Sequence, residues 1–249
     1  MDTKSMRQAI IWLASARSIT VLTGAGVSKE SGIPTFRDAL EGMWANFDPA
    51  ELASPQGFRR NPTRVWQWYA ERREKLEEVQ PNPAHYALAR LEQLKPLTLI
   101  TQNVDGLHEI AGSKNVIELH GNLRKYKCFK KGHPIASTLA RGAKEPPPCP
   151  KCGSLARPDV VWFGEMLPLM ALQRARDAAR EGEVMLVIGT SGLVQPAADL
   201  PLYAVYENRL TIEINPEQTP LTPNLDLHLA GPAGRVMAEL IKGVEEALK

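Results

Sequence analysis

The chain has 249 residues, 43% of them hydrophobic, and a formal net charge of +2. This length is enough for one large domain with a sizeable core, or for a large domain that carries a smaller one. A near-neutral charge without a block of Lys and Arg argues against direct nucleic-acid binding. No apolar stretch approaches the roughly 18 residues that span a bilayer, and the N-terminus lacks a signal-peptide core. We therefore expect a cytoplasmic protein, away from membranes, that acts as a monomer.

Apolar runs typical of buried strands alternate along the chain with helical patterns. The expected strands are residues 19–22, 97–101, 116–119, 184–189, 210–214 and 225–229. The expected helices are residues 4–16, 83–94, 168–181, 196–208 and 232–248, and Asn82 and Pro83 suit the start of the second. Several strands are continuously apolar, as in a parallel sheet covered on both faces. The pattern predicts an α/β fold with a Rossmann-like, doubly wound parallel sheet.

Two stretches interrupt this alternation. Residues 39–80 are helical in pattern and rich in Trp, Arg and Glu, and residues 123–157 hold all three cysteines among many prolines and glycines. We expect them to form a small second domain, with a helical module and a zinc-ribbon-like module. The large, Rossmann-like domain would then consist of residues 1–38, 81–122 and 158–249. A cleft between the two domains is the expected ligand site.

The turn after the first expected strand is the most informative stretch, with the sequence T-G-A-G-V-S-K-E-S-G-I-P-T-F-R-D. Gly24, Ala25 and Gly26 allow the backbone to turn sharply and to approach a phosphate closely. The spacing departs from the dinucleotide fingerprint G-x-G-x-x-G, because Lys29 stands where the third glycine belongs. This departure disfavours a hydride-transferring dehydrogenase.

Polar residues follow four further expected strands, in the stretches T-Q-N-V-D-G-L-H, E-L-H-G, G-T-S and I-N-P-E. Residues just past the carboxyl ends of parallel strands face the ligand crevice. Taken alone, Asn103 and Asp105 before a glycine also suit an ordinary turn. A lone histidine such as His120 is more often structural than catalytic. Its place at a strand end favours a proton acceptor instead.

The cysteines suit a reducing compartment, where clustered cysteines bind metal more often than they form disulfides. Cys149 and Cys152, in C-P-K-C, make half of a zinc site. The other half is irregular, because Cys128 is followed three residues later by Lys131, and His133 is a candidate fourth ligand. Three interpretations stay open: a zinc site of three cysteines and His133, a weak site of the cysteines alone, or a module that folds without metal.

Together these motifs, in family order from residue 20 to residue 234, resemble the sirtuins, which are NAD-consuming protein lysine deacylases. The resemblance implies that acylated-lysine proteins or peptides are the substrates and that NAD is consumed as a co-substrate. The products would be free lysine, nicotinamide and an O-acyl-ADP-ribose. It implies that His120 is the general base, with Asn103 and Asp105 beside it, and that any zinc is structural. The implied NAD-binding residues are Gly24, Ala25, Gly26, Ser28, Phe36, Arg37, Gln102, Asn103, Asp105, Gly189, Thr190, Ser191, Asn215, Glu217 and Ala233.

The stretch R-P-D-V-V-W-F-G-E, residues 157–165, resembles the family's substrate-binding strand. Its residues alone predict only a strand over Val160–Phe163. The resemblance implies that a substrate peptide pairs there as an added strand. The implied contacts are Val161, Phe163 and Gly164.

Tyr69 and Arg72 are three residues apart on an expected helix and share a face. The charged run of residues 71–75 alone suggests that Arg72 is solvated. In class III sirtuins, however, a Tyr-x-x-Arg pair lines the acyl pocket and a nearby Ala, matched here by Ala53, widens it. An Arg fork suits a terminal carboxylate. The resemblance therefore implies activity on succinyl- and malonyl-lysine besides acetyl-lysine.

Two other functions remain compatible with an NAD site. One is a protein ADP-ribosyltransferase, and the other is a non-catalytic NAD-binding module. The presence of His120, Asn103 and Asp105 argues against the second.

Overall fold

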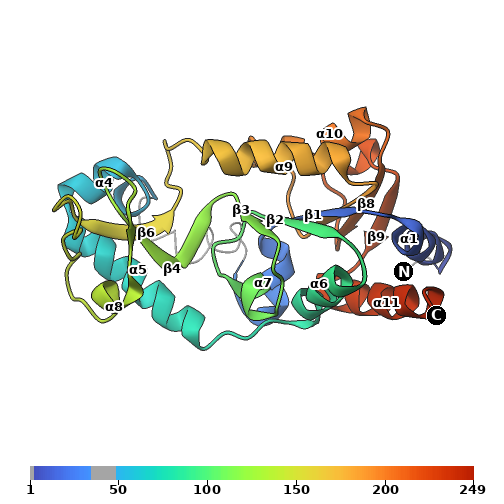
Figure 1. Ribbon diagram of the computed structural model, residues 1–249, viewed down its shortest axis with the longest axis horizontal. Helices are drawn as coiled ribbons and strands as arrows, with labels where there is room; N and C mark the ends of the chain where they lie inside the picture. The colour runs from blue at the N-terminus through green and yellow to red at the C-terminus, as the bar shows by residue number, and fades with distance from the viewer. Residues whose placement is uncertain (1–2, 35–48) are drawn as a thin grey trace.

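The computed structural model describes residues 3–34 and 49–249. A parallel six-stranded sheet forms its larger part, and a three-stranded antiparallel sheet lies at the other end of the long axis (Figure 1). In spatial order, the strands of the large sheet are β3 (Val116–Glu118), β2 (Leu97–Thr101), β1 (Ile19–Thr23), β7 (Val184–Ile188), β8 (Leu210–Asn215) and β9 (Leu227–Ala230). The predicted doubly wound parallel sheet is confirmed.

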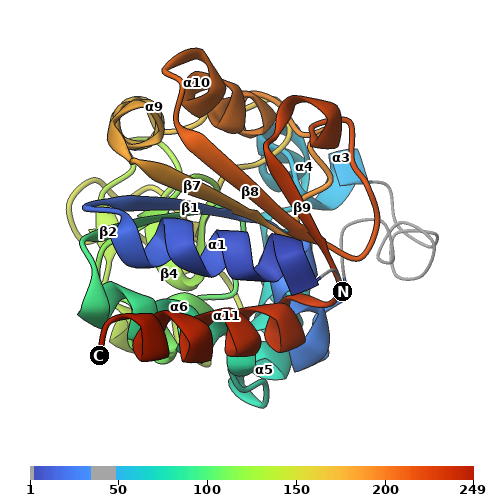
Figure 2. The same cartoon turned by 90° about the vertical axis from the view of Figure 1, so that its right-hand side faces the viewer.

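Helices cover both faces of the large sheet (Figure 2). On one face lie α1 (Thr3–Ser15), α6 (Pro83–Leu94) and α11 (Ala233–Ala247), and on the other lie α9 (Leu169–Glu181) and α10 (Leu200–Tyr206). Successive strand residues point to opposite faces, so Val21 joins the core under α1 and α11 whereas Leu22 joins the core under α9 and α10. Two buried clusters thus explain why the strands are continuously apolar.

Small differences from the sequence expectations have local causes. β7 ends at Ile188, because Gly189 has a left-handed backbone with a φ of 60°. The expected helix over residues 196–208 divides into a 3₁₀ turn, η3 (Ala197–Asp199), and α10. The strand expected over residues 225–229 begins only at Leu227, after the 3₁₀ turn η4 (Thr222–Asn224). The cap at Asn82 is confirmed, since its Oδ1 accepts the Ala84 N–H at 2.9 Å.

The smaller sheet has the order β5 (Pro134–Ile135), β4 (Gly121–Cys128) and β6 (Ala156–Val160). The other helices of the described residues are η1 (Ala25–Ser31), α3 (Pro49–Leu52), α4 (Pro55–Arg60), α5 (Pro62–Glu77), α7 (Leu107–Ile110) and α8 (Ser137–Ala140). β4 and β6 each cross a predicted domain boundary, so the division into two domains stays a prediction. Within the described residues, no helix is long and apolar enough to cross a membrane.

Candidate active site

The motif residues after β3, β2, β1, β7 and β8 meet along one edge of the large sheet, because these strands are parallel neighbours. From β1 the chain first builds β2 and β3 on one side, and then β7, β8 and β9 on the other. Ligands of open α/β sheets bind where the order reverses in this way. Here that point lies between the ends of β1 and β7.

Two glycines allow the turn after β1 to pack directly against the turn after β7. The Gly24 N–H donates to the Ile188 carbonyl at 3.0 Å, and the Gly26 N–H donates to the Gly189 carbonyl at 2.8 Å. A Cβ on Gly26 would stand 2.7 Å from the Gly189 oxygen, too close for any other residue. Ala25 lies between them and is half-buried. The glycines are therefore required for the two turns to touch, as well as for access to a ligand.

A buried hydrogen-bond network holds the turn after β1 against the turn after β2. The Ser28 hydroxyl donates to Asp105 Oδ2 at 2.8 Å and accepts from Asn103 Nδ2 at 3.1 Å. The other Asn103 amide hydrogen reaches the Gly24 carbonyl at 3.1 Å. Both amide hydrogens are thus engaged within the chain, so Asn103 Oδ1 is the side-chain atom that can accept a hydrogen bond from a ligand. Burial raises the pKa of Asp105, although the hydrogen bonds from Leu107 and Ser28 oppose this.

His120 follows β3 at the same edge and is half-buried. Its Nδ1 lies 2.8 Å from the carbonyl oxygen of Gln102. Because a carbonyl only accepts, Nδ1 must carry the proton, and Nε2 keeps its lone pair. Burial lowers the pKa of His120, and the hydrogen bond to Gln102 partly offsets this. The ring is therefore a neutral proton acceptor at neutral pH.

Two further polar residues at the carboxyl ends of the strands bind the turn after β7. Gln102 Nε2 donates to Thr190 Oγ1 at 3.0 Å, and Asn215 Nδ2 donates to the Thr190 carbonyl at 2.8 Å. Ser191 and Glu217 are exposed at this rim. Ala233 is the buried first residue of α11. Phe36 and Arg37 lie outside the described residues.

The expected strand over Val160–Phe163 is wrong beyond its first residue. β6 ends at Val160, and a turn follows in which the Trp162 N–H reaches Glu165 Oε2 at 2.8 Å and the Glu165 N–H reaches the Trp162 carbonyl at 3.0 Å. The two guanidinium nitrogens of Arg157 bind the Glu165 carboxylate at 2.6 and 3.0 Å. Arg157 is buried and also lies over the Trp162 ring, so its ion pair with the partly buried Glu165 fixes the turn.

The backbone around this turn is partly used within the chain. The Val161 N–H donates to the His120 carbonyl at 2.8 Å, which ties the turn directly to the candidate base. The Phe163 N–H donates to the Ala53 carbonyl at 2.9 Å, whereas the Phe163 side chain and Gly164 are exposed. An added peptide strand therefore has fewer open partners here than the sequence suggests.

Ala53 and Tyr69 belong to one buried cluster together with Trp162. The Tyr69 hydroxyl accepts the Trp162 Nε1–H at 2.9 Å, and burial raises the pKa of Tyr69 to about 12. The Arg72 guanidinium lies over the Trp68 ring at 4.5 Å, and burial lowers its pKa. Arg72 is therefore mostly removed from water, unlike its neighbours Glu71 and Glu74, and the solvated interpretation is not supported.

The three cysteines and His133 come together at the tip of the small sheet. Their ligand atoms all lie within 4.8 Å of one another. Cys128 Sγ is 3.7 Å from Cys152 Sγ, and Cys149 Sγ is 3.6 Å from His133 Nδ1. Tetrahedral zinc with its usual bond lengths separates its ligands by about 3.7 Å. The four residues therefore fit a structural zinc ion, as in the first of the three open interpretations.

The comparisons with known proteins agree with this geometry. The family model described as the Sir2 family matches residues 24–196.

The chain belongs to the Sir2 family.

It is 51% identical to NAD-dependent protein deacylase 1 of Archaeoglobus fulgidus, over 100% of both chains. A solved Sir2 homologue in complex with NAD is 50% identical and similar in fold, with a TM-score of 0.90 over 100% of this chain and 96% of the other. Sir2Af2 bound to a myristoylated histone peptide is 35% identical, with a TM-score of 0.78 over 98% of each chain.

Two histidines behind this Sir2-family site were not expected to take part. The rings of His85 and His108 are buried and in contact, with centroids 4.8 Å apart and planes tilted by 52°. His85 Nδ1 accepts the Asn82 N–H at 3.2 Å, so its Nε2 carries the proton and points at Ser28 Oγ, 3.4 Å away. His108 Nε2 contacts Thr23 Oγ1 at 3.0 Å. No local pattern marks the contacts with Ser28 and Thr23, because these form only through the tertiary fold.

The buried pair predicts sensitivity to acid. Burial lowers the pKa of His85 to about 4 from an ordinary 6.5. Below about pH 6.5 the unfolded chain therefore binds a proton at His85 that the folded chain does not bind. The free energy of unfolding consequently falls as the pH falls towards 4. His85 alone should lower the free energy of unfolding by about 2 kcal/mol between pH 7 and pH 5. Urea unfolding at these two pH values measures it, and His85→Gln, which keeps a polar group without this titration, should flatten the slope. An unchanged slope in the variant would refute the assignment.

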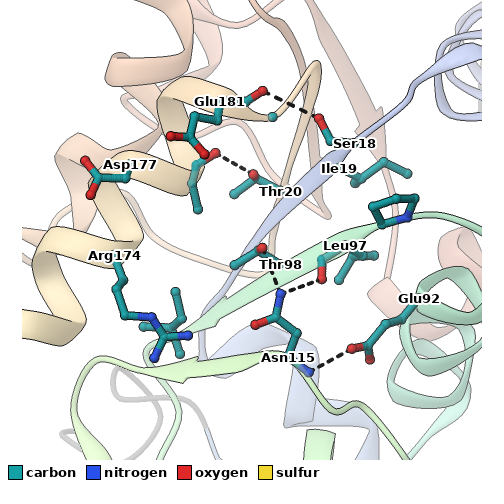
Figure 3. A pocket seen from close by; sticks show the side chains of 14 residues that line it. Ser18, Ile19, Thr20, Glu92, Leu97, Thr98, Asn115, Arg174, Asp177 and Glu181 are labelled. Carbon is teal, nitrogen blue, oxygen red and sulfur yellow. Dashed lines mark hydrogen bonds between the residues drawn. The ribbon is translucent and has the colours of Figure 1, made fainter.

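A separate hollow of about 660 Å³ lies at the opposite edge of the sheet (Figure 3). It is lined by the starts of β1 and β2 and by one side of α9, including Thr98, Asn115 and Arg174. The Asn115 amide is already bound to Leu97 and Thr98. None of the motif residues lines it, and the amino ends of parallel strands lack the turns that hold ligands. It is therefore not the candidate site.

Proposed function

We infer that this chain is an NAD-dependent protein lysine deacylase. The inference is supported by its membership of the Sir2 family and by its 51% identity to a protein of that name. It is supported further by its likeness to a homologue that binds NAD and to one that binds an acylated histone peptide. The observation that carries it is His120, a neutral base that follows β3 at the same edge of the parallel sheet as the two glycines that follow β1.

In the reaction that we propose, the acyl group passes from lysine to the ADP-ribose part of NAD, nicotinamide leaves and one water is consumed. Gly24, Ala25 and Gly26 border the pyrophosphate, where their small side chains let an anion approach the backbone closely. Asn103 Oδ1 accepts a hydrogen bond from a ribose hydroxyl. His120 Nε2 takes the proton of the ribose hydroxyl that receives the acyl group. Ser28 and Asp105 act mainly by fixing Asn103, because their polar groups already bind one another.

The stoichiometry of the reaction tests this function. Purified protein should release one nicotinamide for each lysine that it frees from an acetylated peptide, and it should form no NADH. ADP-ribose attached to protein would support the transferase alternative. Bound NAD without any turnover would support the binding module.

We propose further that the acyl pocket accepts acidic acyl groups such as succinyl and malonyl. Ala53 and Tyr69 line one buried cluster, and Arg72 extends from the next turn of α5 on the same face. The charged fork of Arg72, partly desolvated against Trp68, suits a carboxylate. The neutral hydroxyl of Tyr69 stays protonated across the physiological range and adds a second polar group.

Arg72→Met is the matched test, because methionine keeps most of the apolar stem and removes the charge. We expect kcat/KM for succinyl-lysine to fall by about 100-fold or more, since the acyl carboxylate loses its partner. The value for acetyl-lysine should change by less than about threefold. Steady-state assays on one peptide with either acyl group measure both. Equal losses on the two substrates would contradict the acidic pocket.

A monomeric state, a cytoplasmic location and the absence of direct nucleic-acid binding stay predictions. They rest on composition, and gel filtration would test the first of them.

A further inference from the structure

One arginine of the small sheet joins two parts of the proposed site. The Arg124 guanidinium, near the start of β4, donates from Nε to the Asp105 carbonyl at 2.8 Å and from Nη2 to the Leu76 carbonyl at 2.7 Å. Asp105 belongs to the turn after β2 that carries Asn103. Leu76 lies in the last turn of α5, the helix that carries Tyr69. A single side chain therefore bridges the proposed NAD turn and the helix of the proposed acyl pocket.

The surroundings of Arg124 hold this bridge in place. Its own N–H donates to Asn122 Oδ1 at 2.8 Å, which fixes its backbone. Its stem lies against Gly106, where an added Cβ would stand 3.1 Å from Arg124 Cδ. The preceding Leu123 N–H donates to the Val104 carbonyl at 2.8 Å. The start of β4 thus binds two successive carbonyls of the turn after β2.

The same segment is fixed against α5. Leu123 and Leu76 both belong to the buried cluster that contains Tyr69. Carbonyl groups in the last turn of a helix lack partners within the helix and carry partial negative charge, so a guanidinium suits them. The Leu76 carbonyl also accepts the Val79 N–H, but at 3.4 Å, a longer distance than that to Arg124. The bridge is therefore the shorter of these two bonds.

The bridge needs a planar fork rather than a positive charge alone. Two donors on one rigid guanidinium fix the separation of the two carbonyls that accept from them. A lysine ammonium is a point charge on a flexible stem and does not fix this separation. The bond lengths of 2.7 and 2.8 Å are those of charge-assisted hydrogen bonds.

We propose that Arg124 is a positioning residue that couples the turn of Asn103 to the acyl-pocket helix α5. A lysine bound against α5 constrains the last turn of that helix, and the bridge carries this constraint to the turn that faces NAD. Arg124 acts through Asn103 and α5 rather than on the reacting atoms. The coupling is reciprocal, so each substrate strengthens the binding of the other. This proposal rests on the proposed deacylase function and on the proposed acyl pocket.

Steady-state kinetics give the first test. Arg124→Met keeps an apolar stem and removes the fork. We expect kcat for an acetyl-lysine peptide to fall by about tenfold or more, because small displacements of bound reactants slow their reaction. The KM values for NAD and for the peptide should change by less than about threefold. Raised KM values with an unchanged kcat would overturn the proposal.

Arg90→Met is the matched control. Arg90 Nε also makes a short bond, to Glu245 Oε1 at 2.6 Å, but it joins α6 to α11 at an exposed surface. This variant should keep the normal kcat. A loss as large as that of Arg124→Met would show that any such arginine matters, and it would contradict a specific bridge.

Binding measurements separate coupling from a general loss of structure. Carba-NAD, in which the bond to nicotinamide does not break, would be titrated by calorimetry with and without the acetyl-lysine peptide. In the unmodified protein the peptide should tighten carba-NAD binding by about tenfold, and in Arg124→Met by less than about twofold. A tenfold effect that persists in the variant, or its absence from the unmodified protein, would refute the coupling.

Arg124→Lys keeps the charge beside the last turn of α5 but does not fix two carbonyls at once. It should melt close to the unmodified protein and still lose the coupling, so it carries the test if Arg124→Met does not fold. Full coupling in this variant would overturn the role of the fork. If the unmodified protein turns over no peptide, the proposed deacylase function has failed. The carba-NAD titrations need no turnover, and they would still decide the role of Arg124.

Discussion

His120→Asn is expected to lower the rate of lysine deacylation by about 10²–10⁴-fold, the usual contribution of a general base. Asparagine can still donate to the Gln102 carbonyl, so the local hydrogen bond is kept while the basic Nε2 is lost. NAD binding should change by less than about threefold, because the glycine turn and Asn103 do not depend on this ring. Single-turnover assays and NAD titration by calorimetry measure the two quantities.

His228→Asn is a matched control. His228 Nε2 also contacts a backbone carbonyl, that of Asn215, at 3.1 Å, but nothing places it at the reacting atoms. This control should keep its turnover rate. A His120→Asn protein that deacylates at more than half of the normal rate would contradict the assigned base.

Removal of zinc is expected to unfold the small sheet and to abolish activity. The metal site joins the β4–β5 turn to the loop before β6, and structural zinc sites contribute several kcal/mol or more to folding. Elemental analysis should give one zinc per chain. Cys149→Ser should lose the metal and lower the melting temperature, whereas His133→Cys should retain the metal, because thiolate also suits tetrahedral zinc.

Lys131→Ala serves as the control for the metal site. Lys131 occupies the position of a regular second cysteine, yet only its backbone N–H approaches Cys128. Its side chain should therefore be dispensable for zinc binding. Zinc content near zero in the unmodified protein, with normal folding, would contradict the structural role.

Local patterns accounted for the large sheet and its ligand edge. The apolar runs at β1 and β7 predicted buried strands, and their carboxyl ends meet because all six strands are parallel. The Gly24–Gly26 turn and Asn103 were recognisable because their chemistry lies within a few residues of a strand. His85 was not, because its partner Ser28 lies 57 positions away in the sequence.

The two main gaps in the sequence analysis have tertiary causes. Val161–Phe163 has β-forming residues, but the Arg157–Glu165 pair and the bond from Val161 to His120 fold it into a turn. The fourth metal ligand was ambiguous from spacing alone. A turn at Gly132, where φ is 65°, pairs the Cys128 N–H with the His133 carbonyl and brings the imidazole to the thiolates.

The fate of a labelled acyl group tests the central claim most directly. A peptide whose lysine carries an isotopically labelled acetyl group would be incubated with NAD and the protein, and all products would be followed by mass. The account predicts that the label appears on ADP-ribose, in equal amounts with free lysine and nicotinamide. Label that stays on lysine while ADP-ribose becomes attached to protein, or label released only as free acetate without NAD consumption, would contradict it.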